Sequence, residues 1–377
     1  MRLAFINPNR HDYDVDTPYE RPLAGGESGQ VYLAAALAAK GHEVHLFTDT
    51  SQPGFKRGVH CRSYHDDPPW DDRAAFDAVI VSSGNNMSQP PRSLFGPEPL
   101  ILAWPQDIWH PDPTVTGWLT LMTGPRDFIL CVSPWYRQHI IAEGAIRPDR
   151  TVILGHGISP VFESLFAAGE PILAAKPNPS EEIVLAFTSS PYKGLEPALA
   201  LFKALKPAIP KAVLRIYSGF DHYPPDNVFR KSPDQWESLY RACRDTEGVE
   251  MVGVIPQGDL ARALKASHIY FYPNVAREGF GIAVAEAMAA GCHVITSNLG
   301  ALPQVVGGFG DCVAFEGGQL PAGSFLRATT GAIARLIQDP EATEVRRRQQ
   351  VDFCRNRYSW TQRAAEFEAI LARLQAS

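Results

Sequence analysis

The stretch Glu278-Gly-Phe-Gly-Ile-Ala-Val-Ala-Glu286-Ala-Met-Ala-Ala-Gly291 contains two glutamates eight residues apart. Glu278 precedes Gly279 and Gly281, where the chain can turn sharply. Glu286 falls in a run of small apolar residues that is typical of a buried helix ending at Gly291. A buried lone carboxylate costs on the order of several kcal/mol unless another group pairs with it. Because a helix start also offers backbone N–H groups to an anion, the stretch predicts a site for a ligand with hydroxyls and phosphate.

The composition favours a two-domain globular protein. The chain has 377 residues, of which 45% are hydrophobic and 20% charged, as in ordinary soluble domains. A net charge of −6 argues against a nucleic-acid partner, which usually meets a basic face. The six cysteines are scattered without a CxxC pair, which indicates reduced thiols. The sequence shows no membrane-spanning run and no signal peptide, so we expect a cytoplasmic protein or one peripheral at the inner membrane face.

Short apolar runs alternate with helical segments in the first half of the chain. The predicted strands are Leu3–Asn7, Glu43–Thr48, Phe76–Ser83, Leu100–Trp104, Phe128–Ser133 and Thr151–Leu154, and the predicted helices are Glu27–Lys40 and about Pro134–Ala142. Strands that are apolar on both faces and separated by helices indicate a parallel sheet. A Pro-rich, aperiodic stretch at Phe166–Ser180 then predicts a linker.

The same pattern restarts after this linker. The predicted strands are Glu182–Thr188, Val213–Ser218, Val249–Val254, Ile269–Tyr272 and Val294–Ser297, with helices at Leu195–Leu205, Asp234–Arg244, Gly258–Ser267, Phe325–Gln338, Glu341–Asn356 and Thr361–Gln375. The predicted fold class is therefore α/β, with two doubly wound, Rossmann-like domains at 1–166 and 181–357 that face each other across a cleft. Ligands of such folds bind at the carboxyl ends of the strands.

Two further segments lie where a phosphate would bind. Gly25 and Gly26 come directly before the first predicted helix, where glycines let backbone N–H groups approach an anion, although a simple helix cap is equally compatible. The segment is not a GxGxxG fingerprint, which disfavours a nicotinamide cofactor. Lys193 follows the first strand of the second domain and can reach an anion there, with an exposed turn lysine as the alternative.

Polar residues also follow strands of the first domain. Gln106, Asp107 and His110 come after Leu100–Trp104 among aromatic residues, a mixture that suits sugar recognition or a packed structural loop. His156 lies at the end of the last strand of that domain. It could donate a hydrogen bond to a ligand or serve as a structural histidine. The alternating acids at 12, 14 and 16 lack supporting ligands, so we expect a solvated loop and no metal site.

These residues resemble glycosyltransferase family 4, a family of retaining sugar transferases with the GT-B fold. Glu278–Gly300 is similar to the E-x7-E signature of the family and the segment after it. Gly25-Gly26 is similar to its glycine loop, and Lys193-Gly194-Leu195 is similar to its KGL step. Tyr358-Ser359-Trp360 resembles the point where the last helix crosses back, which assigns 358–377 to the first domain.

The resemblance implies a nucleotide diphosphate sugar donor linked to UDP, GDP or ADP, with no cofactor and no metal. Glu286 would accept hydrogen bonds from the ribose and Glu278 from the sugar, while Lys193 would neutralise the leaving diphosphate. Asp107 would lie near the group that takes the proton of the acceptor. The implied donor-binding residues are Gly25, Gly26, Lys193, Val254, Ile255, Glu278, Gly279, Phe280, Gly281 and Glu286.

Three departures from the family pattern leave alternatives open. The family usually has Arg at the position of Thr188, His at that of Gln106 and Asn at that of His156. The implied activity is retaining transfer of a hexose to a glycan, lipid-linked, protein or small-molecule acceptor, in glycan or cell-envelope polysaccharide biosynthesis. The alternatives are another GT-B nucleotide-sugar enzyme, such as an epimerase or a phosphorylase-like protein, and an inactive module that binds a sugar or a partner.

Overall fold

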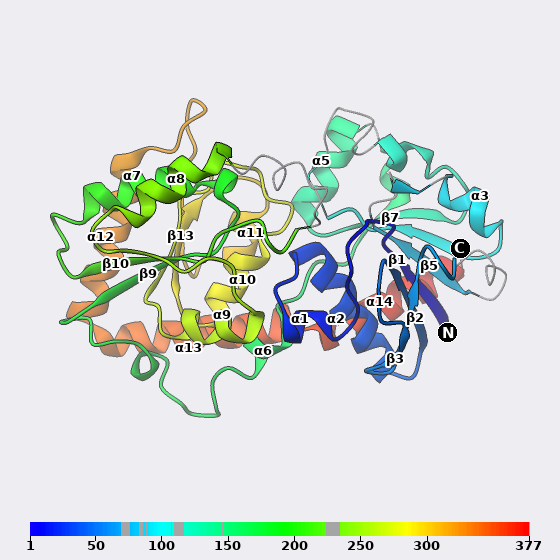
Figure 1. The fold of residues 1–377 in the computed structure, drawn as a ribbon, viewed down its shortest axis with the longest axis horizontal. Helices are drawn as coiled ribbons and strands as arrows, with labels where there is room; N and C mark the ends of the chain where they lie inside the picture. The colour runs from blue at the N-terminus through cyan, green and yellow to red at the C-terminus, as the bar shows by residue number, and fades with distance from the viewer. Residues whose placement is uncertain are drawn as a thin grey trace. The chain divides into compact units, whose positions relative to one another are not determined.

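The computed structural model describes residues 1–68, 76–82, 86–87, 89–106, 108, 117–144, 146–223 and 234–376. Its contacts divide the chain into two units (Figure 1). Unit 1 consists chiefly of Met1–Gly157 and Trp360–Ser377, and unit 2 consists chiefly of Ile158–His222 and Asn227–Ser359. The first change of unit therefore comes before the linker predicted from the sequence.

Unit 1 is built on an eight-stranded sheet with the order β3-β4-β2-β1-β5-β6-β7-β8. Its neighbouring strands are parallel except for the antiparallel pair β3 and β4. The central strands are apolar and fully buried, as expected for a sheet covered on both faces. The strands are β1 (Arg2–Ile6), β2 (Glu43–Thr48), β3 (Gly54–Lys56), β4 (Val59–Ser63), β5 (Ala78–Val81), β6 (Leu100–Ala103), β7 (Asp127–Cys131) and β8 (Thr151–Ile153).

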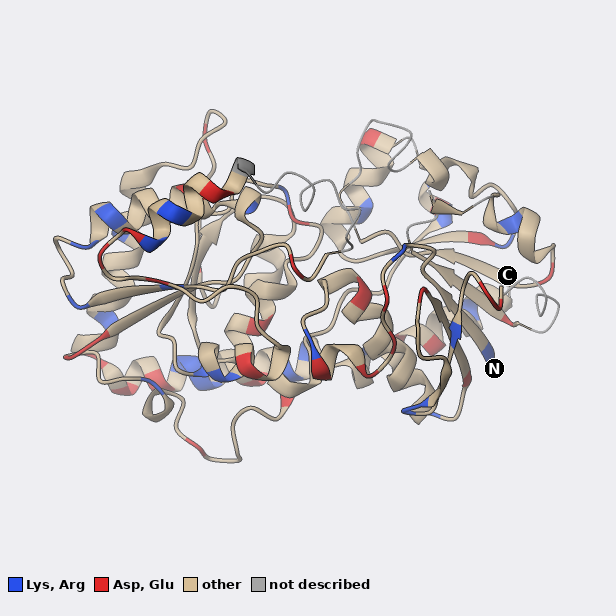
Figure 2. Cartoon of the chain, in the orientation of Figure 1, with Lys and Arg blue, Asp and Glu red and all other residues tan. Residues whose placement is uncertain are grey.

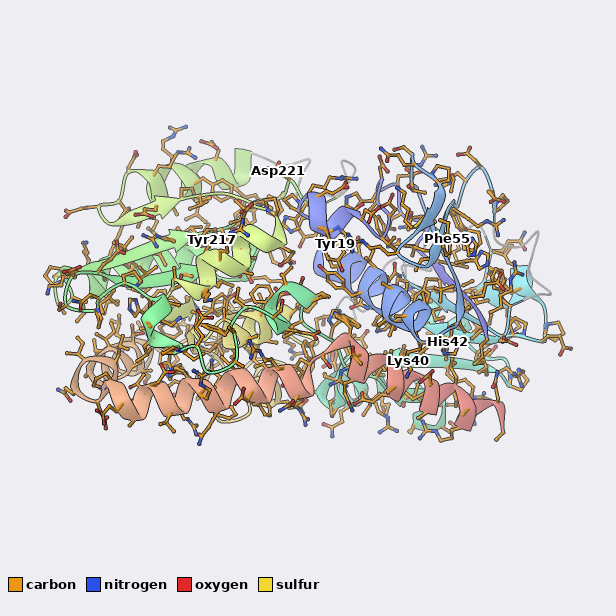
Figure 3. The ribbon with its side chains drawn as sticks, turned by 90° about the horizontal axis from the view of Figure 1, so that it is seen from below. Tyr19, Lys40, His42, Phe55, Tyr217 and Asp221 are labelled. Carbon is orange, nitrogen blue, oxygen red and sulfur yellow. The ribbon has the colours of Figure 1, made fainter. Side chains whose placement is uncertain are left out.

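The last helix of the chain belongs to unit 1. The helices of this unit are α1 (Thr17–Glu20), α2 (Gly25–Ala39), α3 (Pro91–Phe95), α5 (Pro134–Gly144) and α14 (Trp360–Gln375), with 3-10 turns at Gly117–Leu121 and Pro148–Arg150. Lys40 and His42 follow α2 (Figure 3). Lys40 Nζ lies 3.0 Å from Glu368 Oε2 of α14, and His42 Nε2 lies 2.9 Å from Glu368 Oε1.

Unit 2 has a six-stranded, all-parallel sheet with the order β11-β10-β9-β12-β13-β14. The strands are β9 (Ile183–Phe187), β10 (Ala212–Ile216), β11 (Val249–Met251), β12 (Ile269–Tyr272), β13 (His293–Ser297) and β14 (Asp311–Val313). The helices are α6 (Pro160–Glu163), α7 (Leu195–Leu205), α8 (Asp234–Arg244), α9 (Gln257–Lys265), α10 (Ile282–Ala289), α11 (Leu302–Val306), α12 (Ala322–Gln338) and α13 (Pro340–Arg357), with 3-10 turns at Leu173–Ala175 and Pro191–Lys193. Crossover helices between parallel strands place the strand ends of this unit at one edge of the sheet.

The predicted linker Phe166–Ser180 is packed against unit 2. Phe166 and Ile172 form an apolar cluster with Val351 of α13. The buried Lys176 ammonium donates to the carbonyl oxygens of Ser267 at 2.6 Å and of Lys265 at 3.1 Å. The contacts that anchor the stretch are spaced irregularly along it and so produce no periodic signal in the sequence.

Basic and acidic side chains are interspersed over both units, including along α13 (Figure 2). The basic run Arg346–Arg348 lies on that helix, and Arg347 is its buried member. Its guanidinium is buried and hydrogen-bonds to Gln350 and His293. Among the described helices, none combines the length and hydropathy needed to cross a bilayer. A cytoplasmic or peripheral location stays a prediction.

Candidate functional site

The loop between β12 and α10 places the first glutamate beside a helix start. Gly281 caps α10 with φ of +98°, and a Cβ there would lie 2.7 Å from Leu302 Cδ2. Only glycine fits this left-handed, crowded position. The N-cap residue Gly281 makes no side-chain cap bond, and the start of a helix is a favourable place for an anion. The predicted helix start after Gly281 is therefore present in the structure, and anion binding there stays a prediction.

The Glu278 carboxylate is buried and held from two sides. Lys193 Nζ lies 2.9 Å from Glu278 Oε1 and 3.2 Å from Oε2, and Tyr272 Oη donates to Oε1 at 2.7 Å. The backbone is fixed as well, because Ala301 N donates to Glu278 O at 2.8 Å. A Cβ on Gly300 would lie 2.2 Å from that same carbonyl oxygen. The structure thus brings the predicted Lys193 and Glu278 together and adds Tyr272, which the sequence analysis missed.

Lys193 reaches this position through a tight turn after β9. Gly194 has φ of +142°, and a Cβ there would lie 2.5 Å from the carbonyl oxygen of Pro273. Val275 N in turn donates to Lys193 O at 3.1 Å. These contacts connect the end of β9 to the end of β12, so the Lys193 ammonium is placed by backbone packing. Lys193 thus lies in the 3-10 turn that follows the carboxyl end of β9.

Glu286 lies on α10 and is only 4% exposed. Its Oε1 accepts a hydrogen bond from Ser159 N at 3.0 Å. Burial raises the pKa of the carboxyl to about 7, against the opposite effect of that hydrogen bond. Near neutral pH both the charged and the neutral form of the Glu286 carboxyl are therefore populated. Ser159 was missed from the sequence, where its only signal is a serine before the proline that starts α6.

A pair of hydroxyls occupies the position where the family pattern has arginine. Thr188 Oγ1 lies 3.0 Å from Tyr270 Oη, two residues before Tyr272 on β12. Burial raises the pKa of both tyrosines, so both phenols stay neutral hydrogen-bonding groups. Thr188 therefore supplies hydrogen bonding without the positive charge of an arginine.

The remaining predicted residues of unit 2 contribute packing and backbone. The Phe280 ring meets Tyr358 edge to face at 5.5 Å, which leaves the backbone of Gly279 and Phe280 as the part that can face a ligand. Val254 and Ile255 follow β11 and are partly exposed. A Cβ on Gly219, which follows β10, would lie 2.8 Å from Val254 Cγ2.

In unit 1 the glycine pair differs from its prediction. Gly25 and Gly26 form the first turn of α2 itself, whereas the sequence placed them in the loop before the helix. A Cβ on Gly26 would lie 3.1 Å from the Cβ and Cγ of Gln106, so the structure brings these two predicted residues together. Gln106 Nε2 is buried with no hydrogen-bond partner among the described residues. Asp107 and His110 lie outside the described residues.

His156 is buried in an aromatic cluster of unit 1. Its ring lies 5.0 Å from that of Trp360, and a Cβ on Gly29 would lie 2.5 Å from its Nε2. Burial is the main reason that its pKa falls to about 4. A neutral, tightly packed imidazole favours the structural alternative for this residue.

The acidic run after β1 is partly buried, unlike the solvated loop that was expected. Asp12 accepts from Ser51, Asp14 is buried and pairs with Lys56, and Asp16 pairs with Arg57 at 2.6 Å. Each carboxylate thus has a separate partner.

The sequence of unit 2 carries the similarity to a known family. Residues 172–348 match the glycosyl transferases group 1 family. The chain is 31% identical over 124 residues to O-antigen chain mannosyltransferase B of Escherichia coli, a match that covers 33% of this chain and 30% of that protein. It is 28% identical over 141 residues to phosphatidyl-myo-inositol mannosyltransferase of Mycolicibacterium smegmatis, covering 37% and 33%. The matches thus span about a third of the length of these group 1 relatives.

Solved structures show the fold of the whole chain. Sucrose-phosphate synthase from Thermosynechococcus elongatus superposes with a TM-score of 0.70 at 19% identity, covering 100% of this chain and 99% of the other. Anabaena Alr3699/HepE, solved in complex with UDP and glucose, gives a TM-score of 0.67 at 16% identity, covering 99% and 100%. These neighbours have the GT-B glycosyltransferase fold, which confirms the predicted fold class.

Proposed function

We propose that this protein is a retaining glycosyltransferase that moves a hexose from a nucleotide diphosphate sugar to an acceptor hydroxyl. The observation that carries the proposal is the cluster of Lys193, Tyr272 and Glu278 beside the start of α10. The cluster combines a cation for phosphate with a carboxylate for sugar hydroxyls. The match to glycosyl transferases group 1 and the mannosyltransferase names of the relatives support the same activity.

In the proposed reaction, the donor diphosphate lies against Lys193 and the first turn of α10. Both stabilise the negative charge that develops as the bond between the sugar C1 and the phosphate oxygen breaks. Glu278 accepts hydrogen bonds from the sugar, and the buried Glu286 accepts them from the ribose. The acceptor oxygen bonds to C1 on the face that the diphosphate leaves, and its proton passes to a diphosphate oxygen or to a group near Asp107.

The names of the relatives and structural neighbours suggest an order in which to test donors. Because the curated relatives are named as mannosyltransferases, we propose GDP-linked mannose as the first donor. UDP-glucose is second, because one structural neighbour was solved with UDP and glucose, and ADP-linked sugars are third. Candidate acceptors are glycans, lipid-linked sugars, proteins and small molecules. The proposal includes no metal at this site, so EDTA should leave the turnover rate unchanged.

Proton NMR of the reaction mixture tests this proposal. The full-length protein is incubated with each donor and each acceptor class, and the anomeric coupling of the product is compared with that of the donor. We expect an axial donor bond to give an axial product bond, and Lys193→Ala to abolish its formation. A product of inverted configuration would contradict retention, and a changed sugar formed without any acceptor would indicate an epimerase.

Thr188 and Gln106 support the second candidate, an inactive sugar-binding or partner-binding module. Both positions lack the residue that the family pattern has, and Thr188 brings no positive charge to the cluster. Calorimetry with UDP, GDP and ADP separates the candidates. Tight nucleotide binding without turnover on any acceptor would favour the module.

A further inference from the structure

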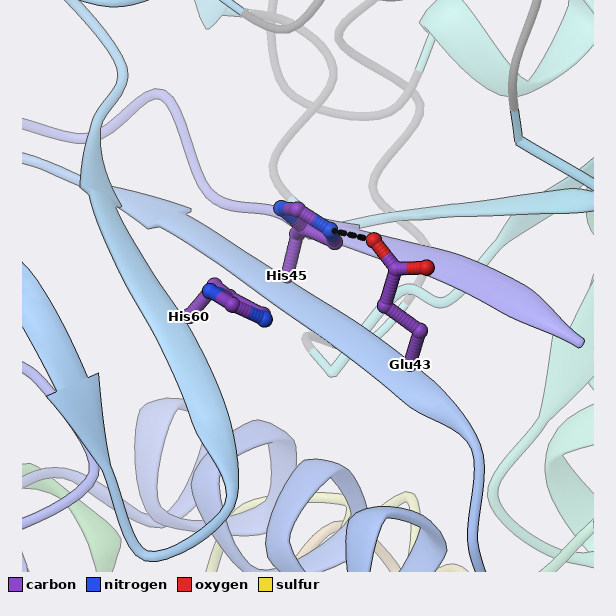
Figure 4. Close-up of side chains that lie close together, drawn as sticks. All are labelled: Glu43, His45 and His60. Carbon is purple, nitrogen blue, oxygen red and sulfur yellow. Dashed lines mark hydrogen bonds and ion pairs between the residues drawn. The ribbon is translucent and has the colours of Figure 1, made fainter.

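Three side chains of unit 1 form a cluster on the sheet, remote in sequence from every residue assigned above. Glu43 and His45 lie on β2 and His60 lies on β4 (Figure 4). One potential ligand atom from each lies within 4.8 Å of the others. We propose that Glu43, His45 and His60 bind a divalent transition-metal ion such as Zn²⁺.

Strand geometry fixes this arrangement. Glu43 and His45 are two residues apart on β2, so their side chains leave the same face of the sheet. His60 is the direct neighbour of His45 in the parallel register of β2 and β4. The two imidazole rings stack at 4.7 Å with an angle of 17° between their planes. The backbone thus presents all three side chains on one face without any special rotamer.

The distances suit a tetrahedral ion. Bonds of about 2.1 Å in a tetrahedral zinc site place neighbouring ligand atoms about 3.4 Å apart. His45 Nε2 is already 2.9 Å from Glu43 Oε1. The Glu43 side chain is 50% exposed and His60 is partly exposed, so both can rotate to close the remaining gap.

The chemistry of the ligands selects the class of ion. Two imidazoles and one carboxylate suit Zn²⁺, Co²⁺ or Ni²⁺, whereas Mg²⁺ and Ca²⁺ prefer oxygen ligands.

Arg2 competes with the ion for the carboxylate. Its Nε donates to Glu43 Oε1 at 2.8 Å, and its guanidinium charge repels a cation at the same oxygen. Removing this charge should therefore strengthen metal binding. A cluster that serves only packing would not respond in this way.

A bound ion would link β2 to β4 near the edge of the sheet, where β4 has only the three-residue β3 beyond it. The ion would stabilise this edge, so the site is independent of the glycosyl transfer proposed for unit 2. The two proposals can therefore fail separately.

Equilibrium dialysis against Zn²⁺ and visible absorption on titration with Co²⁺ test the site in the full-length protein. We expect one bound equivalent and the absorption bands of four-coordinate Co²⁺. Glu43→Gln and His60→Gln should each weaken binding by at least about tenfold, and Arg2→Gln should strengthen it. His65→Gln is the control, because this exposed histidine is 3.6 Å from Asp49 but outside the cluster, and it should change nothing.

Thermal unfolding with Zn²⁺ or EDTA gives a second readout. The Tm of the wild type should rise with Zn²⁺ concentration, and the Tm of Glu43→Gln should not. Glu43 is half exposed, so this variant tests the site even if His60→Gln does not fold. Absence of the Co²⁺ bands, or zinc binding that is the same in Glu43→Gln as in wild type, would overturn the proposal.

Discussion

The Lys193 ammonium lies 2.9 Å from one oxygen of the Glu278 carboxylate and 3.2 Å from the other. The cation proposed to hold the diphosphate is therefore paired with the acid proposed to hold the sugar. If the proposed function is right, donor binding exchanges this ion pair for contacts with phosphate oxygens. The proposal then predicts that the strength of the pair affects nucleotide affinity.

Substitutions of the two partners should change nucleotide affinity in opposite directions. Lys193→Ala removes a charge-assisted bond to phosphate and should weaken GDP or UDP binding by about tenfold or more. Glu278→Gln frees Lys193 from its competing partner and should strengthen nucleotide binding while turnover falls. Calorimetry checks both, with Lys203→Ala on the exposed face of α7 as the control. Weaker nucleotide binding by both variants would contradict the exchange of partners.

Loss of the Tyr272 hydroxyl should reduce turnover and cost part of the stability without unfolding the protein. Tyr272→Phe removes the 2.7 Å bond to Glu278 and keeps the ring, a loss worth about 1–3 kcal/mol at a charged acceptor. We expect kcat to fall by about tenfold or more and the KM for donor to change less. Tyr270→Phe is the matched variant, since Tyr270 lies on the same strand as Tyr272 but its hydroxyl meets Thr188. Equal losses in both variants would argue against a specific role for Tyr272.

The burial of Glu286 predicts a pH-dependent stability. Its pKa is about 7 in the folded protein against 4.5 for an unperturbed glutamate. The folded state therefore holds a proton that the unfolded state releases, and the stability gained below pH 4.5 is lost as pH rises through 7. The Glu286→Gln variant does not lose this stability as the pH rises. The difference in free energy of unfolding, variant minus wild type, should therefore rise between pH 5 and pH 8 by up to about 3 kcal/mol. Urea unfolding at both pH values measures the difference, and an equal difference at both would refute the assignment.

The close approach of Gly300 to Glu278 predicts a large effect of one methyl group. Gly300→Ala adds a Cβ 2.2 Å from Glu278 O, at φ of +69°. Gly308→Ala imposes a similar backbone strain at φ of +82° with no atom within 4 Å, which should cost about 1–2 kcal/mol. We expect Gly300→Ala to lose more stability in chemical unfolding than Gly308→Ala and to lose turnover as well. Similar behaviour of the two variants would show that the contact is relieved without moving Glu278.

The sequence predicted elements with several large apolar side chains in a clear period and missed elements with few such side chains. The predicted helix Leu195–Leu205 matches α7, where Leu195, Ala198, Leu199, Phe202 and Leu205 are buried at helical spacing. In contrast, β4 alternates buried residues with the polar His60 and Arg62 and was not predicted. Without β4 the neighbouring position of His45 and His60 could not be seen.

The site was predictable where local position decides it. Lys193 was assigned because it follows a strand at the sheet edge where ligands bind, and Glu278 because it precedes two glycines and a buried helix. The contact from Ser159 to Glu286 joins residues 127 positions apart, and the approach of Gly300 to Glu278 depends on a turn after β13. Such contacts follow from tertiary packing, which hydrophobic periodicity does not encode.

Titration of GDP and UDP into the wild type and the Lys193→Ala/Glu286→Gln double variant tests the central claim most directly. Isothermal calorimetry at pH 8 reports affinity and stoichiometry together, and circular dichroism checks that the variant is folded. The proposed site predicts one nucleotide bound by the wild type and affinity at least about a hundredfold weaker in the variant, because a phosphate contact and a ribose contact are both lost. Equal affinity of the two folded proteins would contradict the assignment of this cluster as the donor site.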